Sequence, residues 1–195
     1  KFILILALTM SMLNFYFLFN IFNKNTILKE HNEDIYLLVF SLIFVLLIYF
    51  NNFDILNLMI SVLSSLANSG LTLTKSDNNL SLYFLFLTII GGSLISNSSG
   101  IKLSRFYILI KITSAEIIKL ISPNSVINKT IFNSKNKITD ENIKISFLIF
   151  ISFFISLFIL SSFLVFDDLG FEKSFKLAIL TLTNTVNSEM YNLQN

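Results

Sequence analysis

Long apolar stretches separated by short polar ones make up most of this chain. Four of them predict membrane-spanning helices, at residues 2–22, 35–50, 80–95 and 145–166. The last contains 22 residues without a formal charge, and a helix needs about 20 apolar residues to cross the hydrocarbon core of a bilayer. The second has only 16 residues, so we expect its helix to extend into its flanks. The pattern predicts an all-α integral membrane protein.

Two further uncharged segments differ from these spans. Residues 55–74 are long enough for another full span, but their second half carries many hydroxyl and amide groups. Irregular polar backbone is tolerated at membrane depth only where it lines a protein-enclosed or watery cavity. The other segment, residues 177–188, has only 12 residues, a length that suits a half-helix. We therefore expect re-entrant segments within 55–74 and 174–188, each a short helix followed by a loop.

These two segments also repeat one another at an offset of 116 residues. Ser65–Gly70 returns as Thr181–Val186, and Phe50–Phe53 returns as Phe166–Leu169. In each copy an apolar span precedes a short segment that ends in small hydroxyl and amide residues. Repeats in membrane transporters often place the transport site where such polar-interrupted segments converge. The duplication therefore predicts a repeated pore-forming unit.

The segment Gly91–Gly100 interrupts the helical pattern after the third span. Its glycines allow unusual backbone angles and its serines compete for backbone hydrogen bonds, so we do not expect it to be helical. A helical pattern resumes at residues 106–121 and ends before Pro123. From these residues alone, the interruption is either a kink or the cytoplasmic end of a span.

Composition agrees with a membrane protein and narrows its chemistry. The chain is 54% hydrophobic and 13% charged, against about 25% charged residues in soluble domains. It has no cysteine, which excludes disulfides and thiolate metal sites. The predicted spans outside residues 106–121 contain no acid, histidine or cysteine, which disfavours a membrane-embedded enzyme. Basic and aromatic residues do not interleave, so we expect no nucleic-acid partner.

The distribution of basic residues predicts an orientation. Ten Lys and Arg residues lie in segments 23–34 and 100–144, whereas three lie in 51–79 and 167–176. Cytoplasmic loops carry the excess of Lys and Arg, so we expect the first two segments in the cytoplasm. Both re-entrant segments then enter the membrane from the outside.

Several motifs resemble the membrane subunit of the Trk/Ktr-type potassium uptake systems, the TrkH-like family. Ser64–Leu71 resembles the third pore loop of that family and Thr181–Val186 the fourth. Gly91–Lys102, followed by Arg105, is similar to the glycine- and serine-rich break in the second helix of the third repeat, and is the most specific match. Leu13–Phe15 looks like the end of the second repeat. The family implies four helix, pore loop, helix repeats, of which this chain supplies two.

The resemblance implies a carbonyl-lined filter for potassium, the transported substrate, and a gate beneath it. The implied filter residues are Ala67, Asn68, Ser69 and Gly70, and Thr183, Asn184, Thr185 and Val186. The implied gate residues are Gly91, Gly92, Ser93, Asn97, Ser98, Ser99 and Gly100. Val186 stands where the family usually has a filter glycine, and a β-branched residue resists positive φ. A one-residue gap places Asn187 there instead, and the preference for potassium over sodium stays open.

The same resemblance divides the chain and implies its partners. The expected parts are the end of a preceding repeat with a cytoplasmic connection (1–34), the third repeat with its broken second helix (35–122), a cytoplasmic loop (123–144), and the fourth repeat without its last span (145–195). The implied partners are membrane lipid, a second copy in a homodimer, and a cytosolic nucleotide-binding regulator docking on residues 100–144. The implied location is a bacterial inner membrane, and no covalently bound cofactor is expected.

The start of the chain lies within an apolar run, without an initiator Met. We therefore expect a truncated or internal piece of a longer subunit, with a signal peptide at residues 1–22 as the alternative. The alternative function is a non-conducting, truncated membrane assembly protein.

Isolated charged residues carry simpler expectations. Four in the first connection are expected to be solvated: Glu30, His31, Glu33 and Asp34. Lys102 and Arg105 are expected to serve the positive-inside orientation rather than to contact the ion, since cations repel. Asp167 and Asp168 either cap a helix end or, with Glu189, attract cations to the outer mouth.

Overall fold

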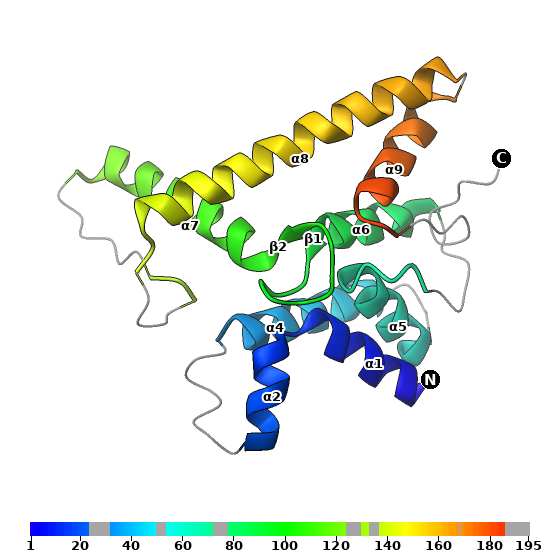
Figure 1. Cartoon of the computed structure of the whole chain (residues 1–195), viewed down its shortest axis with the longest axis horizontal. Helices are drawn as coiled ribbons and strands as arrows, with labels where there is room; N and C mark the ends of the chain where they lie inside the picture. The colour runs from blue at the N-terminus through cyan, green and yellow to red at the C-terminus, as the bar shows by residue number, and fades with distance from the viewer. Residues whose placement is uncertain are drawn as a thin grey trace.

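The computed structural model describes residues 1–23, 32–49, 54–71, 78–123, 130–132, 137–167 and 169–185, most of them helical. In chain order the elements are α1 (Phe2–Met12), α2 (Phe15–Asn23), α4 (Asn32–Tyr49), α5 (Ile55–Leu66), α6 (Asn78–Ile89), β1 (Ile90–Gly91), β2 (Ile101–Lys102), α7 (Leu103–Ile121), α8 (Asp140–Phe166) and α9 (Phe171–Leu182). Figure 1 shows the helices around a central loop that joins β1 to β2. The predicted all-α fold is confirmed.

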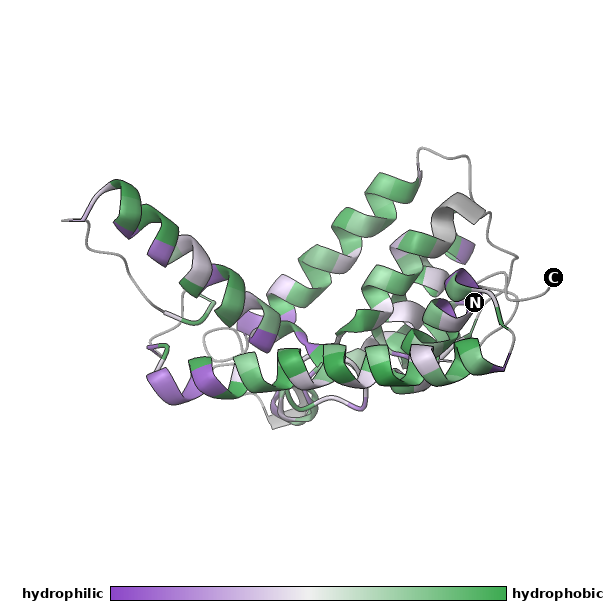
Figure 2. Cartoon of the chain, turned by 90° about the horizontal axis from the view of Figure 1, so that it is seen from above, coloured by the Kyte–Doolittle hydropathy of each residue, from purple (hydrophilic) through white to green (hydrophobic). Residues whose placement is uncertain are grey.

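Within the part of the chain that the structure describes, two helices are long and apolar enough to cross a membrane, α4 and α8. α8 is apolar along most of its length and polar at its start (Figure 2). Its start is capped by Thr139, whose Oγ1 accepts a hydrogen bond from the Asn142 N–H at 3.3 Å. Acidic residues in the first turn, Asp140 and Glu141, suit the positive end of the helix dipole. α8 thus contains the span predicted at 145–166.

The span predicted at residues 2–22 is wrong as a single helix. α1 ends at Met12, and α2 starts at Phe15 in a different direction (Figure 1). Distant backbone groups fix the break. Met12 O accepts a hydrogen bond from the Ser93 N–H, and the Phe15 N–H donates to Ile95 O, both at 3.0 Å.

Two other segments leave the helical conformation earlier than hydropathy indicates. Residues 80–95 are helical only to Ile89, so the predicted third span is too long. Residues 55–74 do not form one full-length helix, because α5 ends at Leu66 after 12 residues. α9 also has 12 residues, and the offset of 116 found in the sequence relates both of its ends to those of α5.

β1 and β2 form a short parallel ladder in the middle of the molecule, with Ile90 opposite Ile101 and Gly91 opposite Lys102. This pairing brings the two ends of residues 92–100 side by side, so we call these residues the central loop (Figure 1). The prediction that the segment is not helical is confirmed. Around it, one hydrophobic core combines fully buried side chains of α1, α4, α5, α6 and α9, including Met12, Leu37, Leu66, Leu87 and Leu180.

Candidate ion-conduction site

The first predicted filter loop begins with a tight cap on α5. Asn68 has φ 55°, in the left-handed region, and its N–H donates to Ser65 O at 3.2 Å. The next N–H, of Ser69, donates to Ser64 O at 3.0 Å, and the hydroxyls of these two serines are 2.9 Å apart. The two backbone bonds form a Schellman motif, in which a left-handed residue closes a helix end. Gly70 follows with φ 67°, which glycine adopts without strain.

The second predicted filter loop begins with the same cap on α9. Asn184 has φ 54°, and its N–H donates to Thr181 O at 3.2 Å. The Thr185 N–H donates to Leu180 O at 2.8 Å. The hydroxyls of Thr183 and Thr185 are 2.7 Å apart. The backbone hydrogen bonds of the two caps therefore correspond residue for residue across the duplication, whereas the hydroxyl pairs lie at different positions.

The surroundings of the two loops differ. Asn68 is buried, and its Nδ2 donates to Thr88 O, at the end of α6, at 2.9 Å. Its Oδ1 is buried without a hydrogen-bond partner among the described residues. Asn184 is exposed. Val186, the counterpart of Gly70, and Asn187 lie outside the described residues.

The central loop contains most of the predicted gate residues. It packs against the end of α6, where Thr88 O anchors the first filter loop. A Cβ on Gly91, just before the central loop, would lie 2.0 Å from Ser99 O. Gly100 has φ 77°, and a Cβ there would lie 2.8 Å from Thr88 O. That same oxygen accepts the hydrogen bond from Asn68. A Cβ at either position would therefore collide with a backbone oxygen. Gly100 also has a positive φ, which residues with a side chain rarely adopt.

The central loop also contacts the second filter loop. The Ser99 hydroxyl donates a short hydrogen bond to Thr183 O. Thr183 is the C-cap residue of α9, and its side chain is fully buried. A predicted gate residue and a predicted filter carbonyl are thus joined directly.

Lys102 and the loop serines hold the shape of the central loop. Ser98 Oγ accepts a hydrogen bond from the Gly92 N–H at 2.7 Å. Lys102 Nζ donates to the carbonyls of Ser96 and Ser98. Asn97 is exposed. The positive-inside pattern alone did not indicate this role of Lys102 in the loop.

The prediction that Glu33 and Asp34 are solvated is wrong. Asp34 is 1% exposed, and its Oδ1 accepts a hydrogen bond from the Asn14 N–H at 2.8 Å. Glu33 is half-buried, and its Oε1 accepts from the Leu94 N–H at 2.9 Å. Backbone N–H groups offset part of the water that the carboxylates lose. The start of α4 therefore supports both the α1–α2 break and the central loop. Two other residues of this connection lie outside the described ranges: Glu30 and His31.

The charged residues near the start of α9 form an exposed ion pair. Lys176 Nζ lies 2.6 Å from Glu172 Oε1, and its hydrogen bond and charge lower the pKa of the Glu172 carboxyl. Asp167 is the exposed C-cap residue of α8, and Asp168 lies outside the described residues. Among the described residues, no three His, Asp or Glu side chains gather as a metal site.

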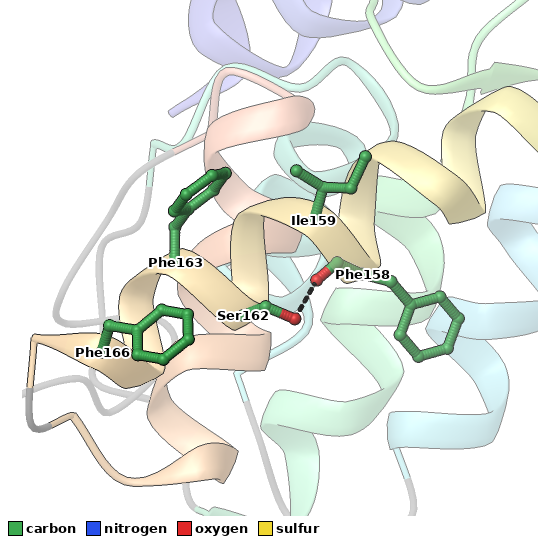
Figure 3. A pocket seen from close by; sticks show the side chains of 5 residues that line it. All are labelled: Phe158, Ile159, Ser162, Phe163 and Phe166. Carbon is green, nitrogen blue, oxygen red and sulfur yellow. Dashed lines mark hydrogen bonds between the residues drawn. The ribbon is translucent and has the colours of Figure 1, made fainter.

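An apolar hollow on α8 is a different kind of surface. It is lined by Phe158, Ile159, Ser162, Phe163 and Phe166, whose large side chains spread away from the helix (Figure 3). The only hydroxyl among them, of Ser162, donates to Phe158 O at 2.8 Å. The hollow is mostly apolar, and its one lining hydroxyl is bonded to its own helix, so it suits lipid or another apolar surface.

Comparison with known proteins identifies the fold. No family model and no curated protein matches the chain. Among solved structures it is similar to the crystal structure of the potassium transporter TrkH from Vibrio parahaemolyticus, with a TM-score of 0.79 and 18% sequence identity. The match covers 95% of this chain and 43% of the TrkH chain. The chain therefore has the fold of part of a TrkH-like membrane protein, as its motifs predicted, and spans less than half the length of that protein.

Proposed function

We propose that this chain forms part of a potassium-conducting membrane pore, with residues 67–70 and 183–186 as two of its filter loops. The observation that carries the proposal is the repeated cap, because α5 and α9 end in the same Schellman motif at corresponding positions. A pore that coordinates an ion with backbone carbonyls needs such equivalent loops from successive repeats. The TrkH-like fold supports potassium as the ion.

The electrostatics of both loops favour a cation. A helix C-terminus carries about half an elementary negative charge, and both α5 and α9 end where the proposed filter loops begin. The buried Asn68 Oδ1, unpaired among the described residues, is a further acceptor. Residues 67–71 and 183–185 carry no basic side chain that would repel a cation.

We further propose that Gly91 and the central loop form the gate of this pore. Glycine and serine give a loop several backbone conformations of similar energy, as a switching element requires. The hydrogen bond from Ser99 uses Thr183 O, an oxygen that a filter would offer to the ion. In this position the loop obstructs the pathway, and opening requires that bond to break.

The wider assignments belong to the same proposal. The chain would be a multi-pass protein of a bacterial inner membrane, with residues 35–122 and 145–195 as two successive pore repeats joined by a cytoplasmic loop at 123–144. It would act in a homodimer. A cytosolic nucleotide-binding regulator would dock on the basic segment 100–144, which carries eight Lys and Arg residues.

Rubidium uptake with sodium as competitor tests the proposal. The assay uses a bacterium without its own potassium uptake systems that expresses the longest reading frame containing this sequence. We expect saturable uptake and an altered rubidium to sodium preference in Gly70→Ser. Gly170→Ser is the matched control, because nothing lies within 4 Å of a Cβ at Gly170. Unchanged discrimination in Gly70→Ser would reject the assigned filter, and no uptake from an inserted protein, even with the regulator co-expressed, would reject the pore.

A further inference from the structure

Phe132 lies in the part of the sequence between α7 and α8. It has a backbone conformation that bulky side chains disfavour. Its φ is 45°, where a bulky residue is a genuine outlier. The side chain is nonetheless 4% exposed. Thr130 and Lys137 pair in an antiparallel bridge, and Ile138 beside it is also buried; we call residues 130–132 and 137–138 the hairpin. Such a backbone persists only when its surroundings hold it in place.

The Phe132 ring is held by tyrosines from two different helices. It stacks on Tyr107 of α7 with ring centroids 4.2 Å apart, and packs against Tyr36 of α4 at 5.2 Å. Asn32, the first residue of α4, donates from Nδ2 to Phe132 O at 3.1 Å. Lys111 Nζ donates to the Tyr107 hydroxyl at 3.2 Å. The hairpin therefore contacts both α7 and the start of α4 and connects the two helices.

These two helices also hold the start of the central loop, at Gly92 and Leu94. On α4, Glu33 lies between Asn32 and Tyr36 in the sequence and accepts the Leu94 N–H at 2.9 Å. α7 follows β2 directly, and the N–H of its first residue, Leu103, donates to the Gly92 carbonyl at 3.2 Å. A shift of α4 relative to α7 therefore acts on both anchors of the loop.

We infer that the hairpin is a latch on the central loop. With Phe132 docked between Tyr36 and Tyr107, the loop is held in its obstructing position, and release of Phe132 frees it. The inference rests on the proposed function only in treating the loop as a gate. Strain at φ favours release and ring stacking opposes it, so the two states lie close enough in energy to switch. Movement of the hairpin then acts on the gate without touching the filter.

Ser93 provides a reporter for this switch. It is fully buried, and its Oγ has no hydrogen-bond partner among the described residues, so Ser93→Cys is a small change. The chain has no cysteine of its own, and any elsewhere in the longest reading frame is replaced by serine. The rate of maleimide labelling of the solubilised protein then measures how often the loop opens. Phe132→Ala should raise that rate about tenfold or more, because it removes a buried, stacked ring.

Three further variants separate a latch from ordinary packing. Phe132→Tyr keeps the stacked ring and should keep the labelling rate. Phe153→Ala truncates a partly buried ring that packs near Phe154 on α8, and should also leave the rate unchanged. Ser161→Cys, a second buried reporter on α8, detects general loosening. Equal Ser93→Cys rates with and without the Phe132 ring would overturn the latch, and so would equal acceleration of Ser161→Cys.

Labelling does not require transport, so the latch and the pore can fail separately. In the rubidium assay we expect Phe132→Ala to raise uptake measured without added regulator. Faster labelling in a protein that never transports would keep the latch and reject the pore. Faster labelling with unchanged uptake would reject the claim that the latch controls a gate.

Discussion

α5 and α9 present the same helix end in two different settings. Both helices close with an asparagine at nearly identical positive φ, 55° and 54°. α5 has no charged residue, and its last two turns are buried, whereas α9 carries Glu172, Lys173 and Lys176 in its first half. The first loop is anchored on α6, the next helix in the chain. The second is bonded by the central loop, through a residue 84 positions earlier in the chain.

This difference distinguishes the features that the repeated sequence determines from those that depend on the surrounding structure. The helix length and the cap depend on a few adjacent residues, since a left-handed asparagine and two backbone hydrogen bonds close each helix. The anchors depend on residues brought together by the fold. We therefore interpret the first loop as the fixed part of the proposed filter and the second as the part that the proposed gate bonds directly, through Ser99.

The sharpest test of this difference is to remove both asparagines in turn. Asn68→Ala loses the buried bond to Thr88 O and places alanine at positive φ, so it should destabilise the fold by about 3 kcal/mol. Asn184→Ala changes an exposed side chain and should cost about 1 kcal/mol, from the backbone alone. Thermal stability of the solubilised proteins gives both values. Equal losses would mean that the two loops are anchored alike.

Gly70 should show a smaller effect than Asn68. Alanine at its φ of 67° is strained, so Gly70→Ala should cost about 1 kcal/mol or somewhat more. Gly170→Ala meets no atom within 4 Å and has an ordinary negative φ, so its effect should stay within about 0.5 kcal/mol of zero. The same stability measurement applies. A Gly70→Ala protein as stable as Gly170→Ala would contradict the left-handed conformation assigned to the first loop.

Sequence reasoning reached the features that depend on local pattern. Hydropathy located α4 and α8, since a membrane span is recognised by an uninterrupted apolar run. The offset of 116 residues located both capped helices, and the glycines at 91 and 100 predicted a non-helical segment. The TrkH-like motifs indicated the fold that the structural comparison then identified. Each of these signals lies in a short stretch of sequence, or in the comparison of two such stretches.

The errors all concern contacts between distant parts of the chain. The break after Met12 depends on Ser93 and Ile95, some eighty residues later. Glu33 was expected to be solvated because a carboxylate near a polar connection usually is, but Leu94 supplies an N–H that keeps it half-buried. Positive φ at Phe132 has no sequence signal, because phenylalanine does not favour it and contacts from Tyr107, Tyr36 and Asn32 retain it. Tertiary partners of this kind cannot be read from periodicity.

A small change in stability is expected at the hydroxyl that joins the central loop to the second filter loop. Ser99→Ala removes its bond to Thr183 O and should lower stability by only about 0.5–1 kcal/mol. If that bond holds the loop over the filter, its loss should raise rubidium uptake a few-fold, about fivefold at 1 kcal/mol. Ser69→Ala is the matched change on the first loop, where the hydroxyl contacts Ser64 instead of the gate. It should not raise uptake. Higher uptake in Ser69→Ala than in Ser99→Ala would reverse the assignment, making the first loop the one that the gate controls.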